Sequence, residues 1–100
     1  MNLGQTIKMC RSRRGLTQAE LAKRAEFSVS YLSLLENNER DPSLSTLQRI
    51  AIALDVPISI LFFLAAERGE LAGLGEDLAG RLAKTALEFL SAPEREPTLL

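Results

Sequence analysis

Apolar residues recur at helical spacing along most of the chain, and capping or stop residues separate one apolar stretch from the next. The first stretch predicts a helix from about Leu3 to Arg13 that stops at Gly15. Thr17 is followed three residues later by Glu20, the spacing of a capping box. A second helix is therefore expected over Gln18 to Ala25.

A third helix is expected after only about three connecting residues, because Ser28 is a good cap and follows Ala25 closely. Asparagine tolerates the left-handed conformation at a helix end, so Asn37 and Asn38 are expected to close this helix. Leu32 and Leu35 form its buried stripe. The residues left facing outward are Ser28, Val29, Ser30, Ser33 and Leu34.

Two further helices follow the loop over residues 39–42. Ser45 is expected to cap the fourth, which ends near Asp55. Pro57 suits the first turn of the fifth helix. The fifth helix has one apolar face containing Leu61 and a second one made by Ile60, Phe63 and Leu64. A helix with two apolar faces has to pack against other segments on both faces.

A sixth helix is expected over residues 76–90, after a joint marked by Gly69, Gly73 and Gly75. Its apolar stripe is wide enough to require a partner surface. It can fold back on the fifth helix or pair with a second subunit, and we favour the pairing. The predicted dimer or partner surface comprises Ile60, Phe63, Leu64, Leu78, Leu82, Ala86 and Phe89.

Composition favours a small all-α protein, since leucine, alanine, glutamate and arginine outnumber β-branched and aromatic residues. We expect a five-helix domain over residues 1–68, a C-terminal amphipathic helix within 69–91 and a disordered tail over 92–100. The single Cys10 cannot form an internal disulfide, and no secretory signal is visible, so a cytoplasmic location is expected. The longest apolar stretch, 58–66, is too short to span a membrane.

Charge is unevenly distributed, although the chain has a formal net charge of −1. Residues 1–49 carry eight basic and five acidic side chains, whereas residues 50–100 carry four basic and eight acidic ones. The basic half is therefore the candidate for binding a polyanion, and the acidic half is expected to have another role.

The segment Thr17 to Glu36, TQAELAKRAEFSVSYLSLLE, resembles the helix-turn-helix of the phage repressor and Cro family, also called the XRE family. The resemblance extends from Leu3 to about Phe62 and includes the NNERDPSLSTL loop and the IAIALDVPISILF closing helices. It implies a transcriptional regulator that binds double-stranded DNA, and we expect a dimeric repressor.

The resemblance places the third helix in the major groove, where Ser28, Val29, Ser30, Ser33 and Leu34 would contact base edges. None of the five offers a bidentate hydrogen bond to guanine or adenine, so modest direct readout is expected, supplemented by phosphate contacts and DNA shape. The residues expected to contact phosphates are Arg14, Thr17, Gln18, Tyr31, Asn37, Asn38 and Arg40.

Two further expectations come from the family. The positions of Arg11 and Glu36 match those of an internal ion pair in relatives, which predicts a structural role for both. The turn between the second and third helices commonly has glycine where this chain has Glu26, because that residue needs a positive φ.

Other functions have less support. An enzyme is disfavoured because the chain has no histidine, no paired cysteines for a metal and no glycine-rich phosphate loop after a strand, and no cofactor is expected. An antitoxin or accessory protein would keep the DNA-binding domain and use the acidic C-terminal half to bind another protein. A pure interaction module would lack DNA affinity altogether.

Overall fold

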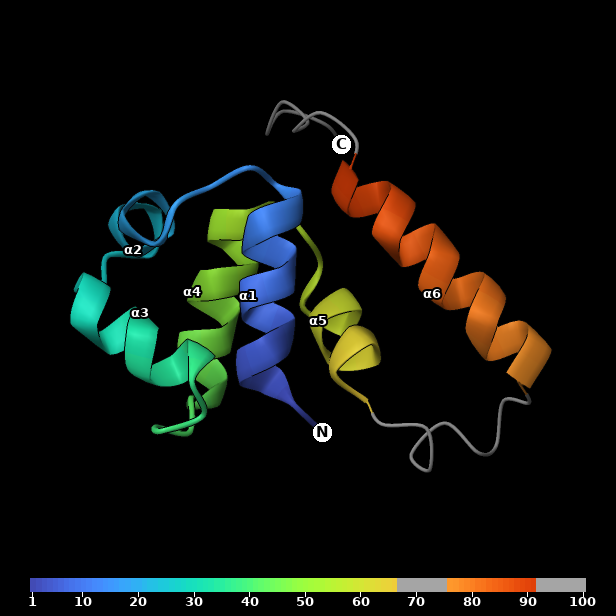
Figure 1. Cartoon of the computed structure of the whole chain (residues 1–100), viewed down its shortest axis with the longest axis horizontal. Helices are drawn as coiled ribbons and strands as arrows, with labels where there is room; N and C mark the ends of the chain where they lie inside the picture. The colour runs from blue at the N-terminus through green and yellow to red at the C-terminus, as the bar shows by residue number, and fades with distance from the viewer. Residues whose placement is uncertain (67–75, 92–100) are drawn as a thin grey trace.

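The computed structural model describes residues 1–66 and 76–91, with side chains from residue 80 onward in the second range. These residues form helices and no strands, which confirms the all-α class and the expected five helices followed by one more (Figure 1). The helices are α1 (Leu3–Arg13), α2 (Gln18–Ala25), α3 (Val29–Glu36), α4 (Leu44–Leu54), α5 (Ile58–Ala65) and α6 (Glu76–Ser91).

Side-chain caps set the starts of the first four helices. Asn2, Thr17, Ser28 and Ser43 each accept a hydrogen bond from a backbone amide in the first turn that has no partner within the helix. The prediction that Ser45 caps the fourth helix is wrong. The Ser43 hydroxyl accepts from the Thr46 amide at 3.1 Å and bonds the Thr46 hydroxyl at 3.0 Å, so α4 begins earlier, at Leu44.

The core lies between helices that are distant in sequence. In Figure 1, α1 and α4 occupy the centre, α2 and α3 lie on one side of them, and α5 and α6 lie on the other. The large side chains that are fully buried come from every helix: Ile7, Leu21, Leu32, Leu35, Ile50, Leu54, Leu61 and Leu90. The helix-turn-helix unit, which consists of α2 and α3, therefore packs against α1 and α4.

Gly4 allows α1 to approach the end of α3 closely. A Cβ atom added at Gly4 would lie 2.5 Å from the Leu35 carbonyl oxygen and 2.8 Å from the Glu36 carbonyl oxygen. The Gly4 amide also donates a hydrogen bond to Oδ1 of Asn38 at 3.1 Å. Glycine is required here by the close contact between two backbones, and not by an unusual backbone conformation.

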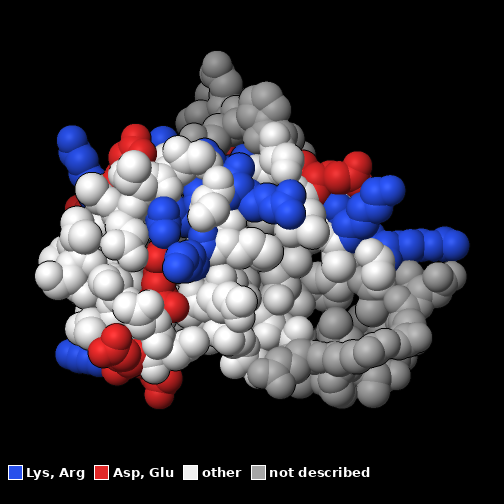
Figure 2. Space-filling view, in the orientation of Figure 1, with Lys and Arg blue, Asp and Glu red and all other residues white. Residues whose placement is uncertain are grey.

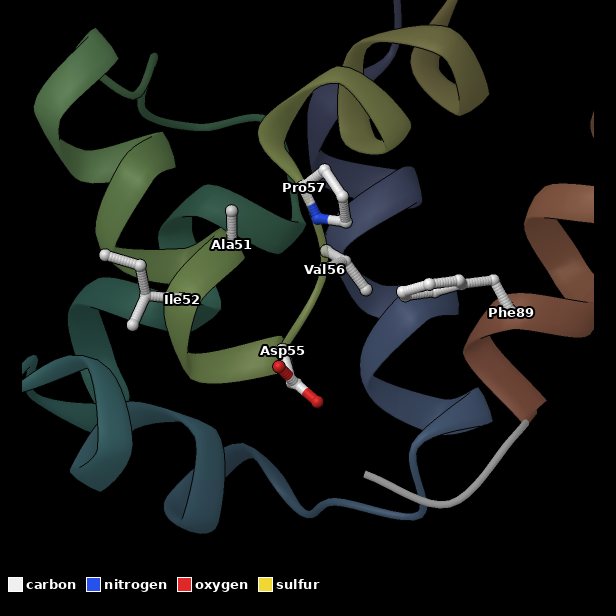
Figure 3. Close-up of a pocket in the computed structure, with 6 residues that line it drawn as sticks. All are labelled: Ala51, Ile52, Asp55, Val56, Pro57 and Phe89. Atoms are coloured by element: carbon white, nitrogen blue, oxygen red, sulfur yellow. The ribbon is translucent and has the colours of Figure 1, made fainter. Parts of the chain in front are cut away.

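The sixth helix folds back on its own chain, against α1 and α5. Ala86 and Leu90 are buried in this contact, and Leu87 and Phe89 pack against its edge. The Phe89 ring points toward Val56 and Pro57, at the junction of α4 and α5, where the three residues help to line a hollow of about 350 Å³ (Figure 3). The structure thus shows that α6 packs against its own chain, while the predicted pairing with a second subunit stays a prediction.

Some sequence predictions fall outside the described residues. These are the joint at Gly69, Gly73 and Gly75, the side chain of Leu78, and the tail over 92–100. Among the described helices, none is by itself long and apolar enough to cross a membrane; α4 and α5 meet that criterion only together, and the chain bends by 106° between them.

Candidate nucleic-acid interface

The bend between α2 and α3 is formed by one left-handed residue. Glu26 has a φ of 62°, as expected for a position that is often glycine in the family. The next amide, that of Phe27, donates to the Ala22 carbonyl at 2.8 Å and closes the end of α2. Holding a non-glycine residue in this conformation costs roughly 1–2 kcal/mol, so other contacts must stabilise the turn.

Arg49 on α4 supplies such contacts, and sequence reasoning missed them. Its Nη2 donates to the carbonyl oxygens of Ala25 at 2.7 Å and Glu26 at 2.9 Å. Its guanidinium carbon also lies 4.4 Å from the centre of the Phe27 ring, a cation–π contact. A cation at the C-terminal end of α2 is favourable because that end carries partial negative charge. Arg49 therefore fixes the bend on which the direction of α3 depends.

The third helix separates its inner and outer faces cleanly at its N-terminal end. Leu32 and Leu35 are buried in the core. Ser28, Val29 and Ser30 are exposed, whereas Ser33 and Leu34 are half-buried. That list contains all five residues predicted to contact bases. Ser28 is the cap, and the helical residues Val29 and Ser33, like Ser30 and Leu34, are four positions apart and so share a side of α3. Their side chains include no charged group.

A buried carboxylate ties the first three helices together at the other end of α3. Glu36 accepts two hydrogen bonds from Arg11, at 2.8 Å from Nε and 3.1 Å from Nη2, and a third at 2.9 Å from Nε2 of Gln18. Arg11 also donates to the Leu16 carbonyl at 2.9 Å. The side chain of Glu36 is only 1% exposed and that of Arg11 is 13% exposed. The structure thus joins the expected ion pair and adds Gln18 to it.

The capping box at the start of α2 lies next to this cluster. Thr17 accepts from the Glu20 amide at 3.1 Å, and the Glu20 carboxylate accepts from the Thr17 amide at 2.9 Å. Hydrogen bonds to the carboxylate from the Thr17 amide and, secondly, from the Thr17 side chain lower the pKa of Glu20 from its ordinary value near 4.5. Thr17 is exposed at a helix N-terminus, whose free amides and positive dipole end suit a phosphate.

The remaining predicted phosphate contacts divide into two groups. Asn37 and Arg40 are exposed just beyond the end of α3, and Tyr31 is half-buried with its ring edge-on to Phe27. Asn38 has a φ of 59°, and its side chain bonds the Gly4 amide and the Asn2 side chain, so it anchors α1 to the end of α3.

Arg14 also has a structural role that sequence did not indicate. Its Nε donates to the Leu54 carbonyl and its Nη2 to the Asp55 carbonyl, both at 2.8 Å. These are carbonyls at the C-terminal end of α4, where a cation is favourable. The guanidinium also lies 5.9 Å from the Phe89 ring of α6. A phosphate contact by Arg14 would compete with these interactions.

The outer face of α3 has no basic side chain, and the basic side chains lie outside this helix. In the view of Figure 2, Lys and Arg atoms gather over α1 and again over α6. Of α1, Lys8 and Arg13 are exposed; of α6, Arg81 and Lys84 are exposed. Within the part of the chain that the structure describes, no group of three or more histidine, cysteine, aspartate or glutamate residues could hold a metal ion.

Comparison with known proteins agrees with this geometry. A family model described as helix-turn-helix matches residues 7–61, so it ends within α5 and leaves α6 outside. The immunity repressor protein of Bacillus phage phi105 is 46% identical over 61 residues, which cover 61% of this chain and 42% of that protein. The HTH-type transcriptional regulator SinR of Bacillus subtilis is 38% identical over 60 residues, covering 59% of this chain and 54% of SinR.

A third relative, the transcriptional regulator ClgR of Mycobacterium tuberculosis, is 33% identical over 66 residues, covering 66% of this chain and 59% of ClgR. The chain thus spans about half the length of these relatives. The matched region contains the capped α2, the left-handed bend and the outward face of α3. The chain therefore belongs to the helix-turn-helix family of DNA-binding transcriptional regulators that is also called the XRE family.

Proposed function

We propose that this chain is a cytoplasmic repressor that binds a specific double-stranded DNA sequence as a homodimer, with α3 of each subunit in the major groove. The observation that carries the proposal is the two-faced character of α3. Leu32 and Leu35 anchor it in the core, while Ser28, Val29 and Ser30 stay exposed at the end that enters the groove in this family.

The proposed contacts follow from exposure. Ser28, Val29, Ser30, Ser33 and Leu34 contact base edges. Thr17, Asn37 and Arg40 are exposed and contact phosphates, and Gln18 and Tyr31 contribute from half-buried positions. We assign Arg14 and Asn38 to the fold, because their side chains bond other helices. Gln18 also bonds another helix through Glu36, but its side-chain amide has a second N–H that can donate to a phosphate. Phosphate contacts supply affinity and orientation, whereas base contacts supply specificity.

A homodimer is proposed because a single eight-residue helix reaches few base pairs, and two copies double the number. The surface available for pairing is smaller than sequence suggested, since Ala86 is buried within its own chain. Leu82 is 41% exposed, and Ile60, Phe63 and Leu64 are half-buried. These residues remain the proposed dimer surface.

One observation favours a second candidate function. Leu82 is a large apolar residue exposed on a helix that lies outside the family match, in the acidic half of the chain. An accessory DNA-binding protein or antitoxin that holds another protein through α6 would have such a surface. Co-purification of a stoichiometric partner that is lost in Leu82→Asp would favour this candidate over the simple repressor.

The test of the main proposal is to select bound DNA from a random pool and to titrate the best sequence against a scrambled one. Ser30→Asp places a negative charge on the outer face of α3 and should lower affinity about tenfold or more. Ser59→Asp makes the same change at an exposed position on α5 and should have little effect. Equal effects of the two substitutions, or equal binding to both DNA sequences, would overturn the proposal.

The stoichiometry needs a separate measurement. Analytical sedimentation of the full chain, alone and with the selected DNA, should give two chains per duplex. A selected sequence with a single half-site and one bound chain would contradict the dimer while leaving DNA recognition intact.

A further inference from the structure

The outer face of α3 has an unusual chemistry for a surface that must distinguish bases. From Ser28 to Leu35 the chain has no charged residue and no asparagine or glutamine. The groups that form two parallel hydrogen bonds with guanine or adenine are therefore absent. The outer face offers hydroxyl groups and aliphatic carbon only.

Val29 is the prominent apolar residue on this face. It is the first residue of α3 and is 45% exposed, and it is not among the residues that pack against the core. Its side chain is branched at Cβ, which leaves one strongly preferred rotamer in a helix. An isopropyl group is thus held in a fixed direction at the N-terminal end of α3.

The hydroxyl groups on either side of Val29 are less suited to discriminate bases. The Ser28 hydroxyl accepts a hydrogen bond from the Tyr31 amide at 3.0 Å, so the helix cap takes up part of its hydrogen-bonding capacity. Ser30 is exposed, but a single hydroxyl can donate to or accept from any base pair.

In the major groove, the only apolar group on a base edge is the C5-methyl of thymine. We infer that Val29 contacts a C5-methyl group in each half-site, so that this protein selects DNA by a pyrimidine methyl rather than by hydrogen bonds to that base pair. The inference rests on the proposed insertion of α3 into the major groove. It also implies that 5-methylcytosine, which carries the same methyl group, is bound better than cytosine at that position.

The experiment uses the full chain and the DNA sequence selected above. Each thymine of one half-site is replaced in turn by deoxyuridine, which lacks only the methyl group. At one position the affinity should fall about fourfold, which is the change expected when one methyl-sized apolar group is no longer buried on binding. When the same position carries cytosine, converting it to 5-methylcytosine should raise affinity by a similar factor.

The Val29→Ala variant assigns the effect to its residue. It should bind the thymine and deoxyuridine sequences equally, because the isopropyl group is gone. Ile52→Ala removes a side chain that is 79% exposed on α4 and should keep the full methyl preference. Val29→Ala is expected to fold normally, since the side chain is exposed, and its melting curve checks this.

The outcomes separate the two proposals. A selected sequence that is bound equally with and without each methyl group overturns the methyl contact and leaves DNA recognition standing. A methyl preference that persists in Val29→Ala overturns the assignment to Val29. If no sequence is selected at all, the proposed function fails, and the methyl contact fails with it.

Discussion

Replacing Glu36 by alanine tests the structural role of the cluster that joins α1, α2 and α3. The substitution removes three hydrogen bonds, two from Arg11 and one from Gln18. It leaves the guanidinium of Arg11 with only the Leu16 carbonyl as a partner among these contacts. In the described part of the chain, no buried side-chain nitrogen or oxygen lacks a hydrogen bond, so the variant would create an exception.

The expected magnitude follows from burial. Removing one partner of a buried ion pair costs about 3–5 kcal/mol, chiefly because the other charge is left unpaired. Arg11 is 13% exposed, so water can reach its guanidinium in part, and the lower end of about 3 kcal/mol applies. For a domain of 60–100 residues, 1 kcal/mol corresponds to roughly 4–8 °C in Tm. Glu36→Ala should therefore lower Tm by about 12 °C or more.

The assay is thermal unfolding followed by far-UV circular dichroism, with Glu39→Ala as the matched control. Glu39 is an exposed acidic residue three positions further along the chain, and its removal should change Tm little. The double variant Arg11→Met, Glu36→Leu should recover most of the loss, because it leaves no unpaired buried charge. A Tm for Glu36→Ala that matches the control would refute a structural role for the pair.

Four further predictions concern single positions. Gly4→Ala should destabilise the fold by about 1–3 kcal/mol in urea unfolding, because its Cβ would press on the Leu35 carbonyl; an unchanged midpoint would contradict this. Glu26→Gly should raise stability by up to about 1 kcal/mol by relieving the left-handed strain, whereas a loss would show that the strain is small. Because hydrogen bonds lower the pKa of Glu20, wild type should be more stable than Glu20→Gln at neutral pH. The gap should narrow as the pH falls below the ordinary value of 4.5 and close once the pH is below the lowered pKa; an equal gap at all pH values would count against it. Burial raises the pKa of the Cys10 thiol to about 11, so at pH values near 8 a thiol reagent should react only as fast as the domain opens, and fast labelling of the native protein would be the contrary result.

The helices that lie within the family pattern could be predicted from local sequence. Thr17, Ser28 and Gly15 act through neighbours a few residues away, so their spacing alone indicates where helices begin and end. The positive φ of Glu26 followed from the family pattern, which often has glycine there. The choice of Ser43 over Ser45 as a cap could not be made, because both serines have suitable spacing and the decision depends on the buried Thr46.

The contacts of Arg14, Arg49 and Asn38 could not be predicted, because each joins segments more than twenty residues apart. An exposed phosphate-binding arginine and one that caps another helix look the same in a sequence. The position of α6 was open for a related reason. A wide apolar stripe shows that a helix must be buried against another surface. It does not show whether that surface belongs to the same chain or to a second one.

The outer side of α3 has no charged group, and this affects how substitutions can alter the DNA affinity and the sequence preference of such a protein. In the proposed DNA complex, attraction to the polyanionic backbone has to come from basic residues outside that helix, such as Arg40 or Lys8. A substitution at either basic residue should weaken binding to every duplex by a similar factor and preserve the order in which different operators are occupied. Altering that order requires changes within α3, so overall strength and target choice can be adjusted independently of each other.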